Sequence, residues 1–341
     1  MDPLRKSLAL IFVVIVILGC FAVGGWALLS YWFSTTPRSG SPALIFPTRS
    51  ANSDLPTSTS ALQTNGTIPS PGDDPQGKIV YVCQLFKLQA RDQICIINAD
   101  GTGQRRLSTQ DSVRYFYPSM APDGKSVFFS SNLYGNFKLY ELTLNGELSS
   151  LGNTIGIAPE VSPNNLLLTF ANNNGQHDQI WVANRDGSNP RMLYNDAWDP
   201  TWSPDSSRIL YATTIDGKPQ LASINLDGSD YRQITDLPDM RGRSDWSEDG
   251  KHIVTYSGKP WERELYIMDP DGSNLHQITP AGGNSQGPSF SPDGQWVAFT
   301  AYFNAIGNNN GCEIYIMRLD GSRLTRLTNN TFCDWQPRWG P

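Results

Sequence analysis

The chain is poor in the residues that most metal centres and catalytic sites use. Its 341 residues include only three histidines, His177, His252 and His276, and no C-x-x-C motif. Because zinc sites are usually built from clustered cysteine and histidine ligands, we expect no metal and no cofactor. An excess of basic residues is also missing. The formal net charge of −6 leaves no positive footprint for nucleic acid, which we exclude as a partner.

Charge is sparse in general, at 17% of the residues, whereas turn-forming residues are frequent, with 30 glycines and 24 prolines. Such a composition is typical of an all-β fold with many turns. The apolar share of 39% is sufficient for a packed core.

The run 8–33 contains no charged residue at all. As a helix it would be about 39 Å long, enough to cross a hydrocarbon core of about 30 Å with some tilt. Arg5 and Lys6 precede it, and Tyr31 and Trp32 end it like an interfacial aromatic belt. We therefore predict that residues 1–33 are a short cytoplasmic tail and a single-pass transmembrane anchor. The rest of the chain would then lie on the extracytoplasmic side of the cell membrane.

A cleaved lipoprotein signal is the alternative. Ile17-Leu18-Gly19-Cys20 resembles a lipobox, in which Cys20 would be lipidated. The sequence remains apolar through 21–33, where a mature lipoprotein normally turns polar, and the run is too long for a signal-peptide core. Both interpretations tether the C-terminal part outside the membrane.

Residues 34–77 are dominated by Ser, Thr, Pro, Asn and Gly, with a single apolar cluster at 43–46. This composition buries too little apolar surface to offset the entropy of ordering it. A coil of this length averages about 35–40 Å end to end. We predict a disordered linker.

From Lys78 onward the sequence repeats itself every 41 to 44 residues. Copies of the pattern Pro-x-Trp-Ser-Pro-Asp-Gly lie within 117–124, 199–206 and 287–294, with weaker copies at 158–165 and 243–250. Each copy is followed by two β-rich runs, an Asp-Gly or Asn-Gly turn and a last short run. Four short strands in each period of about 40–45 residues are typical of a β-propeller, and Asp-Gly is a strong hairpin signal.

The first copy, 78–107, lacks its Pro-x-Trp strand, and the chain ends on that strand at 335–339. We therefore expect the C-terminal strand to complete blade one and close the ring, which removes an exposed edge. The prediction is a six-bladed β-propeller over 78–341.

The Pro-x-Trp-Ser-Pro-Asp-Gly strand, the Asp-Gly-Ser hairpin and the Leu-Thr ending resemble the WD-like repeat of the TolB-type β-propellers. The resemblance covers essentially all of 78–341 and implies the propeller fold. The chain departs from the family in lacking the extra N-terminal TolB domain. The copies at 158–165 and 243–250 also lack the strict Pro-Asp-Gly.

Four cysteines fall in the repeat region. Cys83 ends the second strand of blade one and Cys95 begins the third. Cys312 begins the third strand of blade six, and Cys333 lies in the connection into the closing strand. An even number in an oxidising compartment favours disulfides, so we predict Cys83–Cys95 and Cys312–Cys333. Free buried cysteines in a reducing compartment are the alternative.

Three further patterns have simpler structural interpretations. The G-x-S-x-G motif at 283–287 leads into a predicted strand rather than a helix, so we read it as a loop and not as a nucleophile elbow. Four aromatic residues at one place of the repeat are expected to be core rather than a carbohydrate platform: Trp202, Trp246, Phe290 and Trp339. Four repeated aspartates are expected to form turns rather than to bind calcium: Asp123, Asp205, Asp249 and Asp293.

The segments that enter each inner strand do not follow the repeat. Exposed Trp, Tyr and Arg are common binding anchors, and loops on a rigid scaffold commonly carry function. We predict that these segments form a ligand-binding funnel, with the following residues: Tyr115, Tyr117, Trp198, Asp199, Arg241, Arg243, Asn284, Asp334, Trp335 and Gln336.

No catalytic constellation is visible, so our first hypothesis is a non-enzymatic module that recognises an envelope protein, a peptide or a glycan. The alternative is a lyase or hydrolase of cell-surface polysaccharide that uses the funnel, because the fold alone does not decide function. A sensory ectodomain is a third hypothesis, and it would need a partner in the membrane.

Overall fold

The computed structural model describes residues 74–341, apart from 85–91, 134, 136 and 304–310 and the side chain of Arg241. The predicted membrane anchor, the Cys20 lipobox and the linker up to residue 73 lie outside these residues. Within the described part of the chain, no helix is long and apolar enough to cross a membrane.

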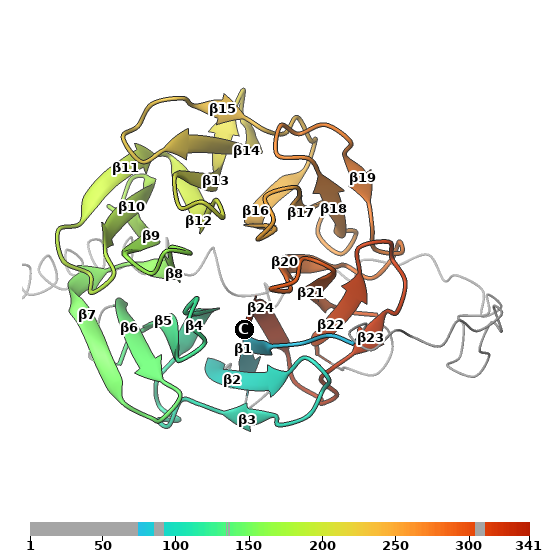
Figure 1. The fold of residues 1–341 in the computed structure, drawn as a ribbon, viewed down its shortest axis with the longest axis horizontal. Helices are drawn as coiled ribbons and strands as arrows, with labels where there is room; N and C mark the ends of the chain where they lie inside the picture. The colour runs from blue at the N-terminus through green and yellow to red at the C-terminus, as the bar shows by residue number, and fades with distance from the viewer. Residues whose placement is uncertain (1–73, 85–91, 134, 136, 304–310) are drawn as a thin grey trace, which may run out of the picture. The chain divides into compact units, whose positions relative to one another are not determined.

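Six four-stranded antiparallel sheets are arranged as blades around a central axis (Figure 1). In each blade the innermost strand is named first. Blade 1 contains β24 (Asp334–Gly340), β1 (Lys78–Gln84), β2 (Asp92–Asn98) and β3 (Arg105–Arg106); blade 2 contains β4 (Tyr115–Met120), β5 (Ser126–Ser131), β6 (Lys138–Thr143) and β7 (Leu148–Ile155); blade 3 contains β8 (Ile157–Val161), β9 (Leu167–Asn173), β10 (Asp178–Asn184) and β11 (Arg191–Asn195).

The other half of the ring repeats the same order. Blade 4 contains β12 (Ala197–Trp202), β13 (Arg208–Ile215), β14 (Lys218–Asn225) and β15 (Arg232–Gln233); blade 5 contains β16 (Met240–Trp246), β17 (Ile253–Ser257), β18 (Glu264–Met268) and β19 (His276–Gln277); blade 6 contains β20 (Gln286–Phe290), β21 (Trp296–Ala301), β22 (Glu313–Arg318) and β23 (Thr325–Arg326). The predicted all-β six-bladed propeller is confirmed.

The ring closes through the last strand of the chain. The C-terminal β24 pairs with β1, with Gly340 opposite Lys78 and Trp335 opposite Val82. Figure 1 shows the red strand β24 beside the blue strand β1 within this blade. The predicted closure of blade one is therefore confirmed.

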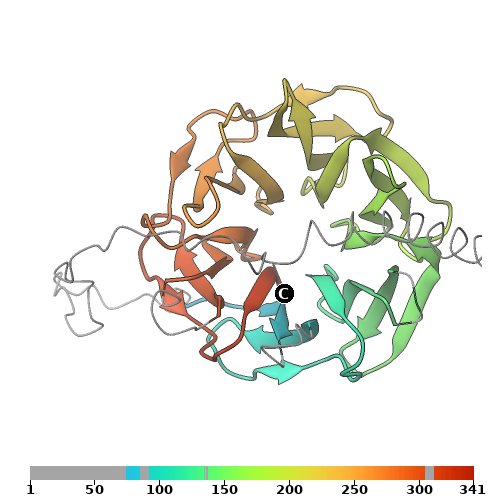
Figure 2. The same cartoon turned by 180° about the vertical axis from the view of Figure 1, so that it is seen from behind.

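The two faces of the ring carry different connections. Each inner strand runs from a funnel face, where Asp334 begins β24, to a hairpin face, where Gly340 ends it. The Pro-Asp-Gly turns follow the inner strands and so lie at the hairpin face. Figure 2 shows the ring from the side opposite to Figure 1. The funnel face is formed by connections between blades and between second and third strands.

Each inner strand has one irregularity in its register, except β16, which has two. At the irregularity shared by all six strands one residue takes a positive φ, which is uncommon outside glycine and is typical of a β-bulge; in β16 the neighbouring Gly242 has a positive φ as well. We call these six residues the bulge ring: Tyr117 (52°), Ala158 (52°), Asp199 (50°), Arg243 (24°), Gly287 (61°) and Gln336 (53°).

The hydrophobic core fills the space between and within the blades. Trp202, Phe290 and Trp339 are buried and Trp246 is partly buried, as the core interpretation of this aromatic series predicted. The four repeated aspartates each accept a backbone N–H two residues further on, which confirms that they form turns: Asp123, Asp205, Asp249 and Asp293.

A set of hydrogen bonds, which we call the polar latch, accounts for the threonine in the Leu-Thr ending of the repeat. In blade 4 the hydroxyl of Thr235 donates to Oε1 of Gln220 at 2.7 Å, and Oε1 also accepts the backbone N–H of Leu237. Glu313 is used in the same way in blade 6, by Thr328 and by the backbone of Asn330. The latch fixes the outer strand and the connection to the next blade.

Both predicted disulfides are present. Cys83 in β1 is bonded to Cys95 in β2, and Cys312 is bonded to Cys333. The second bridge lies directly before β24, where the backbone N–H of Asp334 also donates to the carbonyl oxygen of Cys312 at 2.8 Å. This bridge attaches the closing strand to blade 6.

Candidate functional site

A cavity of about 220 Å³ opens beside the central axis on the funnel side of the bulge ring. We call it the Arg243 pocket. It is lined by Tyr117, Asp199, Arg243, Tyr256, Gln286, Gly287, Thr300, Tyr302, Trp335 and Gln336. Its walls therefore come from blades 1, 2, 4, 5 and 6.

The pocket exists because one member of the bulge ring has no side chain. A Cβ atom placed on Gly287 would meet nothing closer than Cδ of Arg243, at 4.0 Å. The other five positions of the bulge ring carry side chains at positive φ values of 24–53°. At Gly287 the missing side chain leaves the space.

Arg243 is a buried cation without a carboxylate partner. Its residue is 7% exposed, its Nη2 donates to the carbonyl oxygen of Pro118 at 3.3 Å, and its guanidinium lies 5.4 Å from the ring centroid of Tyr117. Nε has no hydrogen-bond partner, and no carboxylate of the described residues lies within 4.0 Å of the guanidinium. Asp199 instead accepts the backbone N–H of Arg243, at 3.0 Å.

Burial lowers the pKa of Arg243 to about 10, helped by the positive charge of Arg338. The group is still protonated at neutral pH. A buried charge without an ion-pair partner is costly unless another group compensates it.

The neighbouring arginine shows the contrast. Arg338 of β24 is paired with Glu160, at 3.3 Å, and with Asp245, at 3.5 Å. Each carboxylate also accepts a hydrogen bond from a hydroxyl group of the next blade: Glu160 accepts one from Thr201, and Asp245 accepts one from Ser289. We call this cluster of one buried cation and two partly buried acids the Arg338 triad.

The remaining walls are mainly aromatic and present hydroxyl groups. Burial raises the pKa of Tyr117 to about 12 and also raises the pKa values of Tyr256 and Tyr302, so all three keep their protons. Thr300 is 3% exposed and its Oγ1 has no hydrogen-bond partner.

An exposed tryptophan stands beside the pocket. Trp261, in the connection between β17 and β18, is 69% exposed and has a φ of 71°. Its ring meets that of Tyr302 edge-on, with centroids 5.3 Å apart. Since Tyr302 lines the pocket, Trp261 extends an aromatic surface outward from its rim.

Five of the ten residues predicted for the funnel line this pocket: Tyr117, Asp199, Arg243, Trp335 and Gln336. They do not lie in loops, as the sequence analysis supposed, but on the inner strands β4, β12, β16 and β24. These strand segments depart from the repeat in sequence because they contain bulges, but they remain paired with the second strands of their blades.

The other five predicted residues do not line it. Tyr115 is buried in the core against Phe129, and Asp334 is fully buried at the start of β24. Trp198 packs in the cluster between blades 4 and 5. Asn284 is buried in the loop before β20, and Arg241 lies in β16 with its side chain outside the described part.

Sequence reasoning missed several residues of the wall and rim. Tyr256, Thr300 and Tyr302 lie at or just after the ends of second strands, and Thr300 is paired with Gln286 of the inner strand. Because neighbouring strands are antiparallel, the end of a second strand lies beside the start of an inner strand. An alignment of the repeats shows which residues end the second strands, so it could have predicted these residues of the pocket wall.

Ser285 of the G-x-S-x-G motif is fully buried. Its backbone N–H donates to the carbonyl oxygen of Arg263, and β20 follows directly. The motif leads into a strand, as predicted: residues 283–285 precede β20, and Gln286 and Gly287 begin it.

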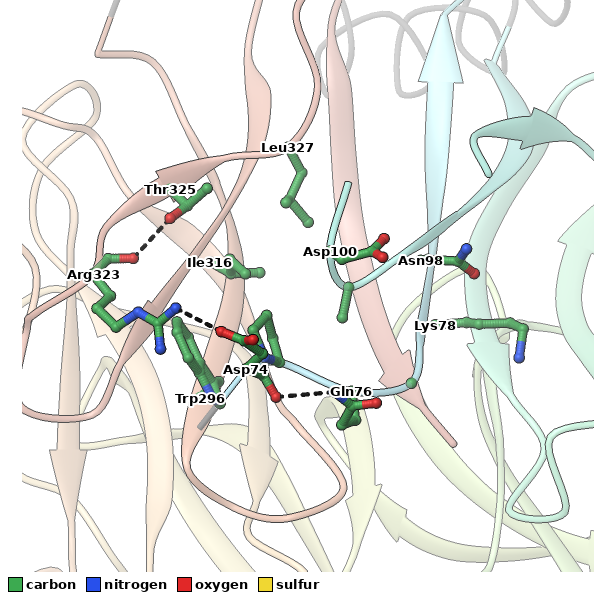
Figure 3. A pocket seen from close by; sticks show the side chains of 13 residues that line it. Asp74, Gln76, Lys78, Asn98, Asp100, Trp296, Ile316, Arg323, Thr325 and Leu327 are labelled. Carbon is green, nitrogen blue, oxygen red and sulfur yellow. Dashed lines mark hydrogen bonds and ion pairs between the residues drawn. The ribbon is translucent and has the colours of Figure 1, made fainter. Parts of the chain in front are cut away.

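A larger hollow of about 570 Å³ lies between blades 6 and 1 at the hairpin face (Figure 3). Figure 3 shows the guanidinium of Arg323 directed at the carboxylate of Asp74, 3.0 Å away, with Trp296 beside it. Asp100 is engaged with Thr102. These pairings make it a weaker candidate than the Arg243 pocket.

Comparison with known proteins agrees with the fold. The family model described as TolB beta propeller domain matches residues 53–237 and 146–304, which together cover more than half of the chain. An uncharacterised protein of Agrobacterium fabrum is 27% identical over 243 residues, 70% of this chain and 67% of that protein.

Two named relatives match shorter stretches. The Tol-Pal system protein TolB of Bordetella pertussis is 29% identical over 43% of this chain and 33% of its own length. Dipeptidyl-peptidase 5 of Porphyromonas endodontalis is 36% identical over 27% of this chain and 14% of its own. The chain therefore spans a third or less of these two proteins.

Among solved structures, TolB from Acinetobacter baumannii superposes with a TM-score of 0.68 at 20% identity, covering 78% of this chain and 67% of that one. An oligogalacturonate lyase from Vibrio parahaemolyticus gives 0.50 at 12% identity, covering 75% and 79%. At such identities the likeness concerns the fold alone.

Proposed function

Because the chain belongs to the TolB β-propeller domain family, we propose that it is a recognition module that binds an envelope protein or peptide at the Arg243 pocket. The observation that carries this proposal is the buried, unpaired Arg243 at the base of a pocket that also contains the unpartnered hydroxyl of Thr300. Buried polar groups are normally satisfied, so an occupant that accepts hydrogen bonds would complete the site.

The rim supports binding rather than a purely structural role. Trp261 exposes a large aromatic surface next to the pocket. Tryptophan, tyrosine and arginine dominate the binding energy of most protein interfaces. The pocket and its rim present all three residue types together.

We further propose that the module is tethered outside the membrane by the predicted anchor, 1–33, and linker, 34–77. The chain joins the ring at the hairpin face, where the carbonyl oxygen of Gly77 accepts the backbone N–H of Ala99. The Arg243 pocket opens on the funnel side. Gly77, where the linker ends, and the Arg243 pocket therefore lie on opposite faces of the propeller.

The test is capture of envelope components by the full-length chain in mild detergent under oxidising conditions. Gly287→Asn should fill the pocket with little change of the backbone, because asparagine tolerates a positive φ and five other bulge positions carry side chains at φ values of 24–53°. Arg232→Met is the matched control, since it removes a 62% exposed guanidinium from the outer strand β15.

A saturable partner that is lost with Gly287→Asn and kept with Arg232→Met would support recognition at the pocket. Equal capture by all three proteins would overturn it. Shortening of a polysaccharide during the incubation, blocked by Gly287→Asn, would instead establish the lyase or hydrolase alternative.

A further inference from the structure

We propose that the Arg243 pocket binds a carboxylate carried by an acidic peptide segment. This inference rests on the proposed function and names the chemical group that is recognised.

The first argument is the balance of charge in the pocket wall. Arg243 supplies a guanidinium that forms no ion pair, and a second one, Arg263, stands behind Gln286 and Tyr256. The Nε atoms of both arginines lack a hydrogen-bond partner. Asp199 is the one carboxylate in the wall, and its Oδ2 is already engaged by the backbone of Arg243.

The second argument is the balance of donors and acceptors. The amide oxygens of Gln336 and Gln286 already accept hydrogen bonds, from the backbone of Tyr117 and from Arg263. What remains for an occupant is chiefly donors: Nε of Arg243 and the hydroxyl groups of Thr300 and the tyrosines. An ionised carboxylate accepts hydrogen bonds and donates none, so it matches this set.

The same balance argues against a sugar ring. Each sugar hydroxyl brings a donor that needs an acceptor, and three acceptors of the wall, the amide oxygens of Gln336 and Gln286 and Oδ2 of Asp199, already accept one hydrogen bond each. A carboxylate on a short aliphatic stem places its oxygens on the donors and its methylene groups against the aromatic rings.

The third argument is size. A cavity of about 220 Å³ holds one side chain or one chain end, but not a folded element. The rest of a peptide would then lie on the rim, where Trp261 offers its exposed face. This arrangement combines a charged anchor with an aromatic contact at the edge.

The experiment is a saturation-transfer NMR titration of the full-length chain in detergent with four small probes. N-acetyl-glutamate α-amide represents an internal glutamate, N-acetyl-glutamine α-amide is its neutral isostere, N-acetyl-alanine represents a C-terminal carboxylate, and galacturonate represents an acidic sugar. We expect the glutamate probe to bind more than about tenfold more tightly than the glutamine probe, because hydrogen bonds to a charged group are lost in the latter.

Arg243→Met and Gly287→Asn should each abolish this preference, while Arg232→Met should keep it. If Arg243→Met fails to fold, Gly287→Asn still decides, since it leaves the arginine in place. The glutamate and alanine probes distinguish a side chain from a chain end, and preference for either over the glutamine probe supports the proposal.

Equal binding of the glutamate and glutamine probes would overturn the proposal, as would galacturonate binding more tightly than both peptide carboxylates. If envelope capture remains sensitive to Gly287→Asn while no carboxylate is preferred, the recognition function stands and this inference fails.

Discussion

The indole Nε1 of Trp339 donates a hydrogen bond to the carbonyl oxygen of Gln76 at 2.8 Å, across 263 positions of the sequence. The backbone N–H of the same residue donates to the hydroxyl of Ser289 in blade 6, at 3.0 Å. Trp339 thus connects the closing strand to the beginning of the ring and to the preceding blade. The two ends of the propeller are held by one side chain and its backbone.

Replacing Trp339 should therefore weaken the closure in two separable steps. Trp339→Phe loses the indole hydrogen bond and should cost about 1 kcal/mol of unfolding free energy, whereas Trp339→Ala also leaves a cavity and should cost about 3–5 kcal/mol. Urea unfolding followed by circular dichroism measures both. A phenylalanine variant as stable as the parent would show that the bond to Gln76 contributes nothing.

The Cys312–Cys333 bridge gives a second prediction about closure. In the chain-entropy model a loop of about 15 residues contributes about 3 kcal/mol, and separations of 12 and 21 residues differ by only about 0.5 kcal/mol. Serine replacement of either pair should thus cost similar free energy. Only loss of Cys312–Cys333 should accelerate amide hydrogen exchange in β24, because that bridge alone precedes this strand. Equal exchange in the two variants would contradict a role in closure.

The fold could be predicted almost completely because each blade repeats the same local chemistry. The hairpin turns, the Pro-x-Trp strand and the missing strand of 78–107 fix the number of blades and the closure. The disulfides followed from the same frame, since the repeat places Cys83 and Cys95 in neighbouring strands. Repetition makes many weak local signals consistent.

The site was predicted only in part, for a physical reason. Departures from the repeat marked Tyr117, Asp199 and Arg243, which line the pocket, but they also marked Tyr115 and Asp334, which are buried away from it. The residue that leaves space for the pocket is Gly287, because glycine has no side chain. A pocket made by a missing side chain leaves little trace in sequence.

Loss of Arg338 should lower the free energy of unfolding, and neutralising its two acidic partners should restore most of it. Arg338→Met leaves Glu160 and Asp245 buried without their cation and should cost about 3–5 kcal/mol. Adding Glu160→Gln and Asp245→Asn should recover most of that loss, because no charge then remains in the Arg338 triad. Urea unfolding of the single and triple variants provides the measurement. A triple variant less stable than Arg338→Met would contradict this account.

Asp334 should make stability depend on pH. Burial, reinforced by the charge of Glu313 and opposed by a hydrogen bond from the side-chain amide of Asn330, raises the pKa of Asp334 to about 7. The folded protein therefore holds this proton between the unfolded pKa, near 4, and pH 7. Stability should be highest at the acidic end of that window, fall as pH rises through it and level off above pH 7.

Asp334→Asn removes this titration. From pH 5 to pH 8 the parent should lose about 2–3 kcal/mol more than the variant, as measured by urea unfolding at each pH. The other buried acids remain in both proteins, so the difference isolates Asp334. Parallel pH profiles would show that the group does not titrate in this range.

Thr300→Val should separate stability from binding. The Thr300 hydroxyl is buried and unpartnered, so replacing it with a methyl group should raise the free energy of unfolding by about 1 kcal/mol. The hydroxyl of Thr213 is equally buried but donates to the carbonyl oxygen of Asp196 at 2.8 Å, so Thr213→Val should destabilise by a similar amount. The two variants therefore act as opposite controls in one urea titration. If the pocket binds a carboxylate, Thr300→Val should also weaken the glutamate probe, whereas Thr213→Val should leave it unchanged. A gain in stability together with a loss in affinity is the signature of a polar group kept unsatisfied for a ligand.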